Sequence, residues 1–260
     1  MKRSLFILCL VLMFINAACS SPAAEPTPTP TPAPPTSTPI PSATSTPVPT
    51  ATPNLAATAE FRATQSAGDV LLELEDILGE SELPYKDGSL LWQQKERQDI
   101  QLRGPDSRYQ PFAEDINGKN FILKSDVTWN ATGILICGII FRSEPNFEEG
   151  KQYNFLFLRF SGAPAWAIEF HEFGRFKNSP TRVQYSSAVD LSNGATNQVL
   201  LVVNEEQFNV YINGVHQGRY FDYSKQSTEG GFAFVGLQDS GEGSCKYENS
   251  WVWELKPSNP

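Results

Sequence analysis

The chain has 260 residues, of which 20 are Lys or Arg and 29 are Asp or Glu, so its formal net charge is −9. An acidic chain without a basic stripe cannot neutralise phosphates, so we expect no nucleic-acid partner. Anionic membrane surfaces are disfavoured for the same reason, and membrane attachment should come from a lipid anchor alone.

The first 18 residues are typical of a signal peptide. Lys2 and Arg3 precede an unbroken apolar run of 11 residues from Leu5 to Ile15, and small residues follow. This run is too short for a helix to cross a hydrocarbon core of about 30 Å. Residues 1–18 are therefore predicted to be removed on export, which leaves 18 basic against 29 acidic residues and a mature charge of about −11.

Cys19 is predicted to carry a lipid. The segment Asn16-Ala17-Ala18-Cys19 resembles the lipobox of bacterial lipoproteins, in which the cysteine receives diacylglycerol and becomes the mature N-terminus. Asn16 stands where that family prefers Leu. The alternative is cleavage by ordinary signal peptidase, which wants small residues at minus three and minus one, and Asn16 departs from that pattern too. The expected location is the extracellular face of the cell membrane, or the medium if Cys19 is not lipidated.

Residues 19–53 are predicted to be the lipidated cysteine followed by a disordered Thr/Pro-rich linker. Alternating Thr and Pro offers almost no apolar surface, and proline removes backbone donors. In polyproline II conformation, at about 3.1 Å per residue, Ser20 to Pro53 would span up to roughly 100 Å. Dense Ser and Thr are also typical of an O-glycosylated stalk, so a glycosylated and an unmodified linker are both open.

Two cysteines remain for the folded part of the chain. One cysteine leaves with the signal peptide and Cys19 is assigned to the lipid, which leaves Cys137 and Cys245. In an exported protein this pair predicts a disulfide. Metal ligation is the less favoured alternative, because His171 and His216, the only histidines of the sequence, are not at ligand spacing to the cysteines.

Residues 54–84 are predicted to be a helical segment. From Asp69 to a stop at Gly79, apolar residues fall at the spacing of one helix face, namely Val70, Leu71, Leu74, Ile77 and Leu78. The acidic residues between them are expected on a solvated face, namely Glu73, Glu75 and Asp76.

Residues 85–257 are predicted to form a mainly β domain. Short runs with strand-like alternation are separated by turns rich in Gly, Pro, Asn and Asp, which is typical of an antiparallel sandwich or barrel. The expected strands are Ser89 to Gln94, Asp99 to Arg103, Phe121 to Trp129, Ile134 to Arg142, Gln152 to Phe160, Ala165 to Phe173, Val199 to Asn204, Phe208 to Ile212, Phe232 to Leu237 and Cys245 to Leu255. In the last strand, alternation places on one face Cys245, Tyr247, Trp251, Trp253 and Leu255.

Asn213-Gly214, between Phe208 to Ile212 and Val215 to Tyr220, predicts a hairpin with a type I′ turn. This hairpin is one of a series of strand-like segments. In chain order, the others are Phe121 to Trp129, Cys137 to Arg142, Asn197 to Val203, Gly230-Gly231-Phe232 and Trp251-Val252-Trp253. The succession resembles concanavalin A-like lectin/glucanase domains, closest to their laminin G-like and 3-keto-disaccharide hydrolase-type branches. The resemblance covers Phe121 to Leu255 and implies a jelly roll of two antiparallel sheets, but it carries no ligand chemistry.

The resemblance also bears on catalysis and calcium. Laminarinase-type hydrolases of this fold carry a Glu-x-Asp-x-Glu array, because retaining chemistry needs two carboxyls about 5 to 5.5 Å apart on one face. That array is missing, and Glu169 and Glu172 alternate onto opposite faces. Related laminin G-like loops hold calcium, so Asp239 and Glu242 are a candidate calcium pair, although they lack regular ligand spacing. No other cofactor is expected.

The predicted hairpin from Gln152 to Phe173 supplies the candidate ligand site. With Ser161 to Pro164 as its loop, Phe157 pairs with Ile168 and Asn154 pairs with His171. One face is core, and the other carries the hydrogen-bonding side chains of Asn154, Glu169 and His171 beside the small Ala165 and Ala167, which leave room for a sugar. The alternatives are a solvated face or one covered by a helix. Because Ile134 to Phe141 is apolar on both faces, the helix around Leu74 is expected to cover that strand.

The sequence thus predicts an exported, monomeric surface lipoprotein whose β-sandwich binds a glycan or a cell-surface protein without catalysis. An enzyme acting on keto-disaccharides and a structural or adhesive envelope module are the alternatives.

Overall fold

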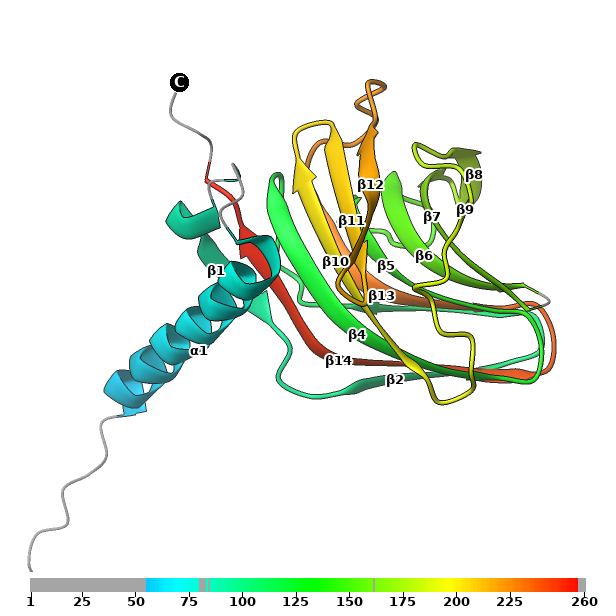
Figure 1. Cartoon of the computed structure of the whole chain (residues 1–260), viewed down its shortest axis with the longest axis horizontal. Helices are drawn as coiled ribbons and strands as arrows, with labels where there is room; N and C mark the ends of the chain where they lie inside the picture. Colours follow the sequence, from blue (N-terminus) through cyan, green and yellow to red (C-terminus); the bar gives the residue numbers. More distant parts are fainter. Residues whose placement is uncertain (1–54, 80–82, 84, 161, 257–260) are drawn as a thin grey trace, which may run out of the picture. The chain divides into compact units, whose positions relative to one another are not determined.

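A computed structural model describes residues 55–79, 83, 85–160 and 162–256 (Figure 1). The predicted signal peptide, Cys19 and the Thr/Pro-rich linker lie outside these residues. Among the described residues, no helix is long and apolar enough to span a membrane.

The described part of the chain is mainly β, with two seven-stranded antiparallel sheets that form a sandwich. The first sheet, called sheet A, has the order β1-β14-β4-β10-β11-β12, and β2 also pairs with β14. The bounds of its strands are Ser89–Gln93 (β1), Gln98–Arg103 (β2), Phe121–Ala131 (β4), Thr196–Asn204 (β10), Gln207–Ile212 (β11), Val215–Phe221 (β12) and Glu242–Glu254 (β14).

The second sheet, called sheet B, has the order β3-β13-β5-β6-β7-β8, and β9 also pairs with β7. The bounds of its strands are Asp106–Pro111 (β3), Leu135–Ser143 (β5), Gln152–Phe160 (β6), Ala163–Glu172 (β7), Arg175–Asn178 (β8), Gln184–Tyr185 (β9) and Gly231–Gln238 (β13). The predicted fold class is confirmed.

Three of these strands have no signal in the sequence. The strands β3, β8 and β9 are rich in polar residues, and each pairs with one neighbour on the rim of sheet B. A strand that is exposed on both faces has no apolar alternation, so the pattern does not predict it.

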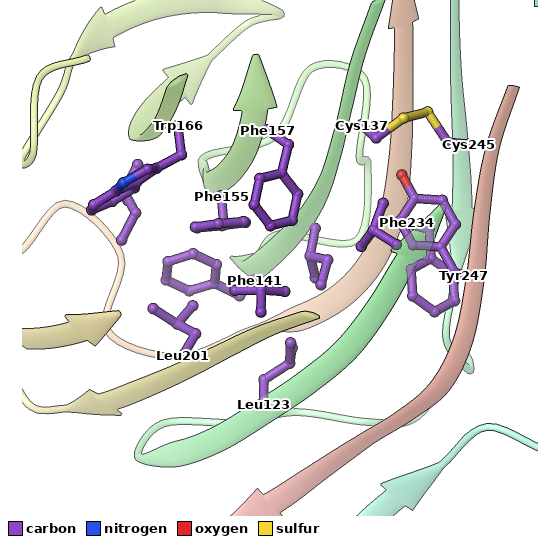
Figure 2. Packing of buried hydrophobic residues seen from close by; sticks show 14 of the residues in the cluster. Leu123, Cys137, Phe141, Phe155, Phe157, Trp166, Leu201, Phe234, Cys245 and Tyr247 are labelled. Carbon is purple, nitrogen blue, oxygen red and sulfur yellow. A yellow bond between two sulfur atoms is a disulfide. The ribbon is translucent and has the colours of Figure 1, made fainter. Parts of the chain in front are cut away.

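The inner faces of the sheets meet in one apolar core. Figure 2 shows Phe155, Phe157 and Trp166 of sheet B facing Leu123 and Leu201 of sheet A. These side chains are buried with an exposed fraction of at most 1%. Aromatic rings contribute much of this core because each removes a large apolar area from water.

A disulfide joins the two sheets at the edge of this core. Cys137 of β5 and Cys245 of β14 are bonded, with their Cα atoms 5.6 Å apart, beside the stacked rings of Phe234 and Tyr247 (Figure 2). The predicted pairing of these two cysteines is confirmed. The bond connects residues 108 positions apart in the sequence.

A β-bulge changes the phase of β14. The register with β4 shifts between Glu248 and Trp251, and Asn249 has a left-handed φ of 52°. The prediction that the apolar residues of β14 share one face is therefore wrong, since an extra residue inverts the alternation. Before the bulge, Cys245 and Tyr247 face the core between the sheets. After the bulge, the side chains that point to the opposite, outer face of sheet A are Trp251, Trp253 and Leu255.

The outer face of sheet A is covered by α1 (Leu55–Leu78). Val70 and Leu74 pack in a second apolar cluster with the tryptophans of β14 and with Ile122, Leu200 and Val202. The helix is confirmed, but the expectation that it covers Ile134 to Phe141 is wrong, because the bulge in β14 creates the apolar surface on sheet A instead.

Glu73 is not a simple solvated residue of α1. Its carboxylate accepts hydrogen bonds from the ammonium of Lys124, which is buried, and from Trp251 Nε1 at 2.9 Å. The helix therefore docks by charge as well as by apolar contact.

Candidate functional site

The hairpin of β6 and β7 places the candidate residues, with a register that differs from the expected one. The strand β6 ends at Phe160 and β7 begins at Ala163, and Gly162 before β7 has φ of 84°, a conformation that glycine adopts at little cost. Phe157 pairs with Trp166 and Asn154 pairs with Glu169. The predicted pairs of Phe157 with Ile168 and Asn154 with His171 are wrong because the turn is two residues shorter. A shift of two leaves each side chain on its predicted face.

Polar side chains form a hydrogen-bonded row on the outer face of sheet B. His171 Nε2 and Glu169 Oε2 are 2.9 Å apart, and about a fifth of each side chain is exposed (20% and 21%). On β6, Gln152 Nε2 donates to Asn154 Oδ1 at 3.2 Å, and Ser143 Oγ donates to Gln152 Oε1 at 3.0 Å. The structure thus brings together the three predicted residues and adds Gln152 and Ser143.

An exposed aromatic ring adjoins this row. Phe176 of β8 lies directly opposite His171, with the ring centroids 6.2 Å apart and the planes at 87°. Its exposed fraction is 57%. Phe176 was not predicted because β8 is a short edge strand without apolar alternation. The one signal for this residue was an apolar ring in a polar segment. We refer to Gln152, Asn154, Glu169, His171 and Phe176 as the polar row.

The rest of this face is closed. Ala165 and Ala167 are fully buried in a third apolar cluster, with Leu156, Leu158 and Val235. Phe147, from the loop between β5 and β6, packs against this cluster, and the Glu149 carbonyl of the same loop accepts the Phe173 N–H at 2.7 Å. The expectation that the alanines leave room for a ligand is therefore wrong. Within the polar row, Gln152 and Asn154 are also buried (4% and 5% exposed), so its accessible members are Glu169, His171 and Phe176.

The polar row has the chemistry of a hydrogen-bonding surface. The contact with Glu169 orients the imidazole of His171, and the buried amides of Gln152 and Asn154 bond each other on the neighbouring strand. Glu172 does not join the row: it pairs with Lys151 at 3.6 Å and with Lys177 at 3.3 Å. The two carboxyl groups thus belong to separate ion-pair networks.

The candidate calcium residues Asp239 and Glu242 lie near the start of β14. Glu242 begins β14 and pairs with Arg103 of β2 at 3.3 Å. Within the described ranges, no three His, Cys, Asp or Glu side chains gather where they could hold a metal ion.

A cavity of about 370 Å³ lies at the seam between α1 and the β14 bulge, and its lining includes Asp69, Glu73, Arg97, Lys124 and Trp251. Its buried cation, Lys124, already has Glu73 as a partner. We therefore interpret this cavity as a feature of the contact between α1 and sheet A and not as a binding site.

Comparisons with known proteins give only distant likenesses. No protein-family model matches the sequence, and no curated protein matches it. Among solved structures, the chain is similar to the carbohydrate-binding module CBM66 from Bacillus subtilis (TM-score 0.43, 15% identity, 58% of this chain and 84% of that chain). It is also similar to sheep galectin-11 (0.39, 12%, 58% and 98%) and to Bacillus licheniformis β-glucanase (0.43, 9%, 62% and 79%). At these identities and TM-scores, the likenesses identify neither the family nor the ligand of this chain.

Proposed function

We propose that this chain is an exported surface lipoprotein whose concanavalin A-like sandwich binds a glycan, without catalysis, at the polar row. The observation that carries the proposal is the pairing of a carboxylate and imidazole, one fifth exposed, with the exposed ring of Phe176. The predicted signal peptide and Cys19 supply the location in the proposal.

A sugar ring needs both kinds of contact. Its hydroxyls take hydrogen bonds from planar side chains, and its C–H face packs on an aromatic ring. Glu169 and His171, each about one fifth exposed, offer an acceptor and a ring N–H or N in a fixed position, since they already hold each other in place. Phe176 offers the apolar surface on the neighbouring strand. A pre-ordered row loses less side-chain entropy when a ligand binds.

An enzyme acting on disaccharides is the second candidate, because the contact between Glu169 and His171 could serve acid–base chemistry. Reducing-end analysis of a bound oligosaccharide separates the two: a binder returns it intact, and release of a shorter product supports the enzyme.

The test of the site is a glycan array with the mature chain, followed by calorimetry on the glycan that binds. Glu169→Ala should weaken binding by more than tenfold, because a hydrogen bond to a charged group contributes about 1.5–3 kcal/mol. Phe176→Ala should weaken it as well. Glu75→Ala is the matched control, since Glu75 is an exposed carboxylate on α1 that pairs with Lys86. Equal affinities for wild type and Glu169→Ala would remove the polar row from the proposal.

The location is tested separately. Cys19→Ala should release the protein into the medium or leave an uncleaved precursor. The reason is that, once the signal peptide is cleaved, the acyl chains on Cys19 would be the only attachment to the membrane, and the variant lacks them. Fractionation and mass measurement of the N-terminus distinguish these outcomes. A cleaved variant that still needs detergent for extraction would contradict the lipid anchor.

A further inference from the structure

A second cavity, of about 210 Å³, lies at one end of the sandwich and shares no residue with the polar row. It lies where β5 and β6 meet the turn between β10 and β11 and the connection from β12 to β13. Its lining consists of Lys119, Arg142, Tyr153, Glu205, Glu206, Phe208, Asp222, Lys225, Ser227 and Thr228.

A β-bulge places Arg142 in this cavity. Ser143 pairs with Gly231 and Ile140 pairs with Ala233, so β5 carries an extra residue there, and Arg142 has a left-handed φ of 49°. Regular alternation would put Arg142 on the outer face with Ile140. The bulge instead aims its side chain toward Tyr153, whose ring belongs to the core between the sheets.

The surroundings of the bulge hold it in this form. Ser227 Oγ donates to the Arg142 carbonyl at 2.7 Å. A Cβ atom on Gly230 would lie 2.4 Å from the Ser143 carbonyl oxygen, so only glycine permits this close approach. A left-handed arginine is costly and persists only where neighbouring structure enforces it.

Arg142 is a buried cation without a carboxylate partner. The residue is 3% exposed, and its Nε and Nη2 donate to the Lys119 carbonyl at 3.0 and 2.6 Å, while Nη2 also donates to the Glu205 carbonyl at 2.9 Å. Within the described part of the chain, it makes no ion pair, and its Nη1 makes no hydrogen bond. Burial lowers the pKa of this guanidinium, which remains charged because its ordinary pKa is so high.

The carboxylates around the cavity, in contrast, all have partners. Asp222 accepts hydrogen bonds from the hydroxyls of Tyr153 and Ser224. Glu206 pairs with Lys225. Glu205 accepts from Asn120 Nδ2 at 3.0 Å and pairs with Lys119 at 3.7 Å. Among the lining charges, Arg142 is therefore the cation without an ion pair and Asp222, which is 6% exposed, is the carboxylate without one, and Arg142 Nη1 is left without a hydrogen bond.

We propose that this cavity binds the carboxylate of a small acidic sugar, with Arg142 as the main contact and Lys225 at the rim. Free volume below the range of about 300–1,000 Å³ for drug-sized ligands admits only a small group. Arg142 Nη1, the guanidinium nitrogen without a hydrogen bond, fits one carboxylate oxygen. The ring hydroxyls would meet Tyr153, Ser227 and Thr228, and the three nearby carboxylates disfavour a dianion such as sulfate.

The probes are methyl β-D-glucuronide, methyl β-D-glucoside, acetate and sulfate, each titrated into the mature chain by calorimetry. The glucuronide should bind at least tenfold more tightly than the glucoside, acetate or sulfate. Equal affinity for glucoside and glucuronide overturns the role of the carboxylate. If acetate or sulfate binds as tightly as the glucuronide, the proposed role of the sugar ring is wrong, because the cavity would then be a general anion site.

Variants assign the site to this cavity. Arg142→Gln should abolish glucuronide binding, and Lys225→Met should weaken it at least threefold. Lys86→Met is the matched control, because Lys86 is an exposed lysine that pairs with Glu75. If Arg142→Gln does not fold, Lys225→Met decides, and unchanged affinity in that variant overturns the proposal. The polar row is tested with the array glycan and Glu169→Ala, and this cavity with the glucuronide and Arg142→Gln, so failure here and failure at the polar row are distinguishable.

Discussion

The outer faces of the two sheets differ in which of their side chains are covered and which stay exposed. On sheet A, the bulge in β14 turns Trp251 and Trp253 outward, and α1 covers them. On sheet B, the partly buried side chains that pack against the outer apolar cluster include Phe147, while Glu169 and His171 stay partly exposed. Both outer faces are thus partly apolar, and on sheet A a helix covers the apolar residues. The free surface of this sandwich is therefore the part that remains after its outer apolar residues are covered.

The disulfide links the two sheets covalently, and its loss should have the largest effect on the free energy of unfolding. Replacing Cys137 and Cys245 by Ser removes the covalent link between β5 and β14. Closing a loop of this length contributes about 4–5 kcal/mol in the chain-entropy model, so the free energy of unfolding should fall by about that much. Urea unfolding of the oxidised protein and the double variant measures the difference. A loss below about 1 kcal/mol would mean that packing alone joins the sheets.

Docking of α1 on sheet A should be the next largest contribution. Leu74 is fully buried in the cluster beneath the helix, so Leu74→Ala should lower the free energy of unfolding by about 3 kcal/mol. Leu72→Ala in the same helix is the control, because Leu72 is 66% exposed and should change stability little. Equal effects of the two substitutions would contradict docking of the helix through this face.

The charge contact of α1 should contribute less than its apolar contact. Glu73→Gln leaves the buried ammonium of Lys124 without its carboxylate, which should cost about 2 kcal/mol. The further change Lys124→Met should recover part of this loss, since no buried charge is then unpaired. Thermal unfolding of the two single variants and the double variant tests this coupling. Additive losses would show that the two residues act independently.

The polar row should contribute least to folding. Glu169→Ala removes a partly exposed carboxylate from the surface of sheet B, so the free energy of unfolding should change by less than about 0.5 kcal/mol. Chemical denaturation of this variant, next to Glu73→Gln, compares the two faces directly. A loss as large as that of Glu73→Gln would assign Glu169 to packing.

Local patterns in the sequence determined much of this protein. Alternation identified the strands that have one buried face, and Asn213-Gly214 identified the hairpin, where both residues have positive φ (49° and 75°). The number of cysteines predicted the disulfide, because the predicted signal peptide and the predicted lipid attachment at Cys19 leave one pair. The side chains of Glu169 and His171 were placed on one face because alternation survives an even shift in register.

Tertiary structure decided what local patterns do not encode. The bulges at Asn249 and Arg142 each insert one residue where no local signal marks it, and each sends side chains to the other face. The docking of α1 on sheet A depends on the first bulge, and the cavity around Arg142 depends on the second. Phe176 joined His171 only because β8 pairs with β7. Contacts of this kind depend on residues that are distant in the sequence, and periodicity within one strand carries no information about them.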